Sequence, residues 1–118
     1  MTVRIIYPSG EHSAYLIAAE TFRSLAEQVS PGVECVVMDD DVGCTEMRPG
    51  EKLVILGDDS VNSVTADLYL RCIMDPLCIK YGTDSYTIRS LTMGDNEALL
   101  LAGGRPRAVL YAVYRYFE

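Results

Sequence analysis

The sequence has one histidine, His12, and no tryptophan. Structural zinc sites use four Cys or His ligands, and the four cysteines here contain no Cys-x-x-Cys pair. The Gly-x-Ser-x-Gly motif that presents a nucleophile is also missing. We therefore expect no catalytic residue, no cofactor and no metal site within these 118 residues.

Long apolar runs and positive charge are also scarce. No apolar run reaches 18 residues, so the sequence predicts no transmembrane helix, and the first residues form a strand pattern rather than a signal peptide. Ten Lys and Arg against 17 Asp and Glu give a net charge of -7. An acidic surface disfavours nucleic acid and anionic membranes, so we expect neither as a partner.

The cysteines and the acidic run Asp39–Asp41 have simple structural interpretations. Cys35 lies in a Val-rich stretch and is expected to be a small buried apolar residue. Cys72 and Cys78 flank Pro76 and would pair only in an oxidising compartment. We interpret the three adjacent aspartates as a solvated loop rather than a metal site.

Strand and helix patterns alternate along the chain. Apolar and β-branched runs predict strands at Thr2–Tyr7, Val33–Met38, Lys52–Leu56, Ser85–Met93 and Ala98–Ala102. Helical spacing predicts helices at Ser13–Val29, at Ser60–Asp75 and from Pro106 onward. In the first helix the expected apolar side contains Tyr15, Ala18, Ala19, Phe22, Leu25, Ala26 and Val29, and the expected polar side contains Glu20, Arg23, Ser24 and Gln28. We expect an α/β (α+β) fold with a mixed five-stranded sheet and about three helices. The first helix should join the first two strands in a crossover, which is right-handed if they lie parallel. The last two strands should form a hairpin, and Lys52–Leu56 should be central.

The closing stretch, Glu97–Glu118, should be a strand, a glycine turn and an amphipathic helix. Gly103 and Gly104 are expected to allow the reversal by adopting positive φ. One apolar helix face is predicted from Leu110, Val113, Tyr114 and Phe117. The helix runs to Glu118 without a glycine cap, so we interpret residues 1–118 as one domain cut from a longer protein.

Three residues of this helix are candidates for an interdomain contact: Arg107, Tyr111 and Tyr114. Arg107 lies in the first turn, where a cation opposes the helix dipole. This placement indicates either a salt bridge to an acidic loop or a contact with a neighbouring domain. The surplus of tyrosines fits a surface that another domain covers.

The closing motif also carries a family resemblance. Leu99–Glu118, containing Ala-Gly-Gly-Arg-Pro-Arg-Ala-Val-Leu-Tyr-Ala-Val-Tyr-Arg-Tyr-Phe-Glu, resembles the end of a domain that precedes the catalytic barrel in bacterial glycoside hydrolases. These include α-glucuronidases and β-N-acetylhexosaminidases. Leu53–Gly57 and Gly82–Ile88 are similar to that family's apolar strand and to its strand entry. Ala108 stands where the family usually has Gly, and Phe117 stands where Leu is common.

The resemblance implies a zincin-like domain without a metal site or catalytic residues. Its partner would be the catalytic domain of the same chain, against which it packs and which it stabilises. Carbohydrate would be bound only by the parent enzyme, which would be secreted or periplasmic. Two alternatives remain open: an independent carbohydrate- or small-ligand-binding module, and a flavodoxin-like regulatory domain with an anion site at Gly57–Ser60.

Overall fold

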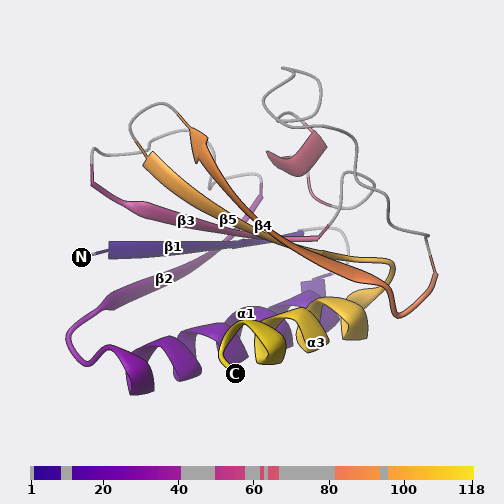
Figure 1. Cartoon of the computed structure of the whole chain (residues 1–118), viewed down its shortest axis with the longest axis horizontal. Helices are drawn as coiled ribbons and strands as arrows, with labels where there is room; N and C mark the ends of the chain where they lie inside the picture. The colour runs from indigo at the N-terminus through magenta and orange to yellow at the C-terminus, as the bar shows by residue number, and fades with distance from the viewer. Residues whose placement is uncertain are drawn as a thin grey trace.

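The computed structural model describes residues 2–8, 12–40, 50–57, 62, 64–66, 82–93 and 96–118. Within them a five-stranded sheet has helices α1 (His12–Val29) and α3 (Pro106–Tyr116) on one face (Figure 1). Residues 64–66 form a helical turn on the other face, inside the predicted Ser60–Asp75 helix. The rest of that helix, most of the Gly57–Ser60 loop, and residues Asp41, Cys44, Cys72 and Cys78 lie outside the described residues.

The sheet is mixed, as predicted. Its strands are β1 (Thr2–Tyr7), β2 (Glu34–Asp39), β3 (Lys52–Leu56), β4 (Tyr86–Met93) and β5 (Asn96–Gly103). They lie in the order β2-β1-β3-β5-β4, so β3 is central. β1 is parallel to both β2 and β3, and β3 is parallel to β5. β4 and β5 form an antiparallel hairpin. The antiparallel edge strand distinguishes this sheet from the all-parallel sheet of the flavodoxin-like alternative.

Both faces of the central strands are buried, which explains why β3 is almost wholly apolar. Neighbouring strand residues point to opposite faces. Ile5 therefore packs beneath the helices with Val54 and Leu101, while Ile6 packs on the other face with Ile55 and Leu100.

Helix α1 has the predicted apolar stripe over most of its length. The buried side chains on this stripe are Tyr15, Ala18, Ala19 and Phe22. The polar side chains predicted to face solvent, such as Glu20 and Arg23, are exposed. The prediction is wrong at Val29, the last residue of the helix, which is 68 % exposed.

Helix α3 uses a different face from the predicted one. Its buried residues are Ala108, Val109, Ala112 and Val113. Leu110 and Phe117 are half-buried, and Tyr114 is exposed, so Tyr114 was wrongly assigned to the apolar face. Successive helical residues are about 100° apart. With Ala112 and Val113 directed at the core, Tyr114 is turned towards solvent.

Gly103 and Gly104 join β5 to α3 without the predicted positive φ. The described glycines with positive φ are Gly32, Gly50, Gly57 and Gly82. What Gly103 provides is space, because a Cβ there would lie 2.7 Å from the Cβ of Ala108. The glycine therefore allows close approach of strand and helix.

Candidate interaction surface

Arg107, Tyr111 and Tyr114 lie on one exposed side of α3. Their spacing of four and then three residues places them along the same side of the helix. The exposed fraction is 45 % for Tyr111 and 52 % for Tyr114, and the Arg107 side chain is exposed as well. The structure thus brings together the three residues that the sequence suggested for an interdomain contact.

Helix α1 extends this surface. The two helices pack side by side on the sheet (Figure 1). Ile17 of α1 is 60 % exposed, and it shares with Tyr114 a shallow groove of about 680 Å³. The other groove residues come from α1: Leu16, Glu20, Thr21, Ser24 and Leu25. We call the surface made by Ile17, Tyr111, Tyr114 and this groove the outer helix face. Sequence reasoning missed Ile17, although an apolar side chain at helical spacing from Ser13, Glu20 and Thr21 was a usable signal.

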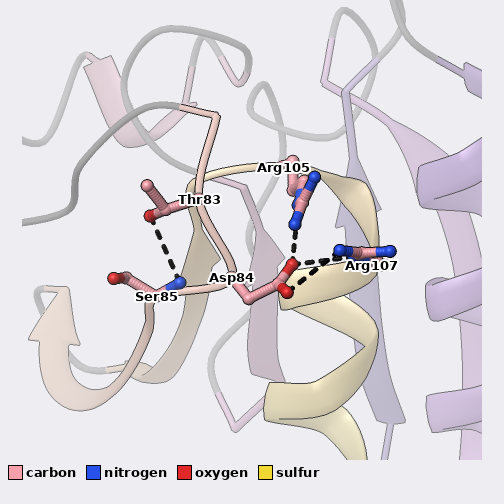
Figure 2. Close-up of polar contacts among 5 residues, drawn as sticks. All are labelled: Thr83, Asp84, Ser85, Arg105 and Arg107. Atoms are coloured by element: carbon pink, nitrogen blue, oxygen red, sulfur yellow. Dashed lines mark hydrogen bonds and ion pairs between the residues drawn. The ribbon is translucent and has the colours of Figure 1, made fainter.

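Asp84 is the centre of an ionic cluster at the beginning of α3 (Figure 2). Arg107 donates from Nε to Asp84 Oδ1 at 2.8 Å and from Nη2 to Oδ2 at 3.1 Å. Arg105 donates from Nε to the same Oδ1 at 2.6 Å. Two backbone hydrogen bonds run alongside, from Gly82 N–H to the Gly104 carbonyl at 2.7 Å and from Gly104 N–H to the Ser85 carbonyl at 2.9 Å. The turn that enters β4 is therefore fastened to the start of α3.

The cluster shifts the acidity of its members. The hydrogen bonds from Arg105 and Arg107 hold the pKa of the Asp84 carboxyl well below its usual range, because they stabilise the charged form. In return, the hydrogen bonds to Asp84 raise the pKa of Arg107. Of the two structural roles that the sequence left open for Arg107, the salt bridge to an acidic turn is present. Sequence reasoning missed Asp84 and Arg105 as its partners, since residues over 20 positions apart meet only in the folded chain.

Charges beside the groove on α1 are also internally paired. Arg23 lies 3.6 Å from Glu20 and 3.3 Å from Glu27, both at helical spacings. Such exposed pairs contribute only about 0.3–0.5 kcal/mol each. The one arginine and two glutamates together leave one net negative charge on α1 beside the groove.

Two buried polar side chains lie at the carboxyl ends of β1 and β3, where ligands often bind in parallel sheets. The amide of Asn62 donates to the Leu56 carbonyl at 2.8 Å and to the Ile6 carbonyl at 3.4 Å. Its oxygen accepts from the Val64 N–H, and the Thr65 hydroxyl donates to the Gly57 carbonyl. Both side chains use these bonds to tie the helical turn to the sheet, a structural role.

The remaining predicted positions give mixed outcomes. Cys35 is a free thiol and is half-buried rather than buried. Its pKa is raised, mainly by partial burial and to a smaller extent by the negative charge of Glu27. Asp40 is only 4 % exposed, so the solvated-loop interpretation was wrong for this residue, which follows β2 directly. His12 begins α1.

Searches within the described part of the chain add two negative findings. No group of three or more His, Cys, Asp or Glu side chains there has the geometry to hold a metal ion. None of the described helices has the length and apolar character needed to cross a bilayer.

No protein-family model matches the chain, and no curated protein matches it in sequence.

Proposed function

We propose that this chain is the non-catalytic N-terminal domain of a glycoside hydrolase, and that it packs against the enzyme's catalytic barrel and stabilises it. The outer helix face is the contact surface in this proposal. Its support is the cluster of exposed apolar side chains, Ile17, Tyr111 and Tyr114. The two tyrosines belong to the closing motif that carries the family resemblance.

The composition of this face suits a protein–protein contact. Aromatic residues are enriched at interfaces, and a Tyr side chain can bury roughly 150–250 Å² there. Large exposed apolar groups gathered on one face mark interaction sites more often than scattered ones do. A neighbouring domain that covered Tyr111 and Tyr114 would remove both from water while their hydroxyls remained free to hydrogen-bond.

The ionic cluster at the edge of the face favours the same use. Covering an unpaired charge is costly, because the charge loses its water without gaining a partner. Arg107 already has both oxygens of Asp84 as partners. A catalytic domain could approach this edge without supplying a carboxylate of its own.

The proposal includes a zincin-like arrangement that has no metal site. Two helices on one face of a mixed sheet, with β4 antiparallel at the edge, are compatible with it. In this arrangement the domain contributes no group to hydrolysis. Paired carboxylic acids in the following barrel would act on the glycosidic bond.

The test uses the longer natural chain that contains residues 1–118 and the region that follows. Replacing Tyr111 and Tyr114 together by Ser should lower the thermal unfolding temperature of the barrel and its hydrolase activity. The matched control is Tyr86→Ser, which removes an exposed tyrosine from β4. The isolated domain should melt at the same temperature with and without the double substitution, because neither tyrosine belongs to its core.

Two results would refute the proposal. One is a reading frame with no barrel carrying paired acids after Glu118. The other is a barrel whose stability and activity are the same with and without residues 1–118.

A further inference from the structure

A second groove, larger than the one between the helices, lies at the C-terminal ends of α1 and α3. Its volume is about 810 Å³. In Figure 1 the amino ends of β3 and β5 extend beyond the end of α3, and these strand ends contribute to the groove. No residue of the outer helix face lines it, so an inference about this groove is independent of the proposed function.

One wall of the groove is aromatic. Phe22 and Tyr116 stack with ring centroids 5.8 Å apart, and Phe117 lies edge-on at 4.9 Å from Phe22 and 5.2 Å from Tyr116. Phe22 is buried, whereas Tyr116 remains 47 % exposed in spite of the stack. Aliphatic side chains, including Val54 and Leu99, continue this apolar surface along the sheet.

The opposite rim is polar but carries no net charge. It contains the hydroxyl residues Ser90 and Thr92 of β4, together with Lys52 and Glu97. The Lys52 ammonium lies 3.3 Å from a Glu97 carboxylate oxygen, so the two charges offset each other. The rim therefore offers donors and acceptors to a ligand without favouring either sign of charge.

We propose that this groove binds a neutral sugar ring. A pyranose has an apolar C–H face that packs on an aromatic ring and an edge of hydroxyls that both donate and accept. This division matches an aromatic wall at Tyr116 facing a rim of hydroxyl groups and a neutral ion pair. The volume lies within the roughly 300–1,000 Å³ of small-molecule sites. A charged sugar would gain nothing from a rim whose charges are already paired, and a purely apolar molecule would make no use of the rim.

The experiment titrates the 118-residue protein with methyl β-D-glucopyranoside and follows backbone amide NMR shifts. Parallel titrations use glucuronate, glucosamine and cyclohexanol, which test an anionic, a cationic and a hydroxyl-poor ring. We expect saturable shifts for the neutral glycoside at amides around the groove, such as Thr92, Leu99 and Phe117. The other three compounds should bind at least about fivefold more weakly.

Two tyrosines of α3 provide a matched pair of variants. Tyr116→Ala should weaken binding about fivefold or more, because it removes the exposed aromatic surface of the groove. Tyr111→Ala should leave the affinity unchanged, since Tyr111 has nearly the same exposure on the same helix but lies outside the groove. Thr92→Val keeps the side-chain shape and removes a rim hydroxyl. It should also weaken binding, and it provides the test if Tyr116→Ala fails to fold.

Several results would overturn the proposal. They are the absence of saturation by the neutral glycoside up to about 100 mM, equal binding of glucuronate, glucosamine or cyclohexanol, and shifts centred on the outer helix face. An equal loss of affinity in Tyr111→Ala and Tyr116→Ala would also overturn it.

Discussion

Arg107 donates two hydrogen bonds to Asp84, one to each carboxylate oxygen, at 2.8 and 3.1 Å. The pair joins the first turn of α3 to the turn that leads into β4. This contact accounts for a cation at a helix terminus where the dipole disfavours it. Arg105 donates a third hydrogen bond to the same carboxylate. Asp84 therefore binds both arginines at the connection between β5 and α3.

Removing the carboxylate should loosen this connection. We expect Asp84→Asn to lower the denaturant midpoint, because two guanidinium groups lose their charged acceptor. The difference in denaturant midpoint between Asp84→Asn and wild type should be smaller at high salt, because salt screens exposed ion pairs. Equilibrium unfolding at low and high salt measures both effects. Glu97→Gln, which breaks a single exposed pair with Lys52, is the control and should shift the midpoint less. Equal midpoints for wild type and Asp84→Asn would contradict the prediction.

The same carboxylate should make stability depend on acid pH. Its pKa in the folded chain lies well below the ordinary value of 3.8, chiefly because Arg105 and then Arg107 hydrogen-bond to it. The unfolded chain therefore binds more protons than the folded chain between these two pKa values, so the stabilisation increases with pH across that window. We expect the stability difference between wild type and Asp84→Asn to be constant above about pH 5 and to decline as the pH falls through 3.8. Urea titrations at several pH values measure it, and a difference that grows on acidification would contradict the assignment.

Gly103 should tolerate no larger residue. Gly103→Ala would place a Cβ 2.7 Å from the Cβ of Ala108 and 2.9 Å from the backbone nitrogen of Val109, so strand and helix would have to separate. Overpacking of this kind costs about 1–3 kcal/mol of unfolding free energy. Ser90→Ala, at an exposed position of β4, should change it by less than about 0.5 kcal/mol. An unchanged unfolding free energy in Gly103→Ala would contradict the prediction and would show that β5 and α3 can move apart at no cost.

Neighbouring residues of α3 should respond very differently to truncation. Val113→Ala removes two methyl groups from the core and should cost about 2 kcal/mol of unfolding free energy. Tyr114→Ala removes a larger side chain from an exposed position, and the expected change is within about 0.5 kcal/mol. Chemical denaturation of both variants tests which face of the helix is buried. The reverse order of effects would contradict the packing described here.

The strands could be predicted from local sequence because their apolar runs are short, β-branched and bounded by turn residues. β1 and β3 were predicted with the observed limits, and β2 was shifted by one residue. Connection length predicted the crossover between β1 and β2 and the hairpin of β4 and β5. The parallel pairing of β3 with β1 and with β5 was not predicted. The buried face of α3 was harder to predict. An apolar stripe through Val113 can include Tyr114 on one side or Ala112 on the other, and only the position of the sheet decides which of these two faces is buried.

The surface features were less predictable. Arg107 could be selected because a cation in the first turn of a helix opposes the dipole. Tyr111 and Tyr114 could be selected because the helix has a surplus of tyrosines. Asp84 could not be matched to Arg107, since nothing local records which loop folds back onto the helix. Asp40 looked solvated beside other aspartates, yet it is buried directly after β2. The groove is formed by both helices and four strands, so no single segment could have indicated it.

The position of β3 between β1 and β5 has a consequence for biosynthesis. One neighbour of this strand is made at the very start of the chain, while the other is made only after another 39 residues have followed β3. Until β5 leaves the ribosome, a growing chain holds β3 as an apolar strand with one open edge, a template for wrong pairing. Translation therefore has to deliver β5, as far as Gly103, before the most apolar strand is enclosed. Protection of the nascent chain is most valuable in the interval between the synthesis of β3 and that of β5.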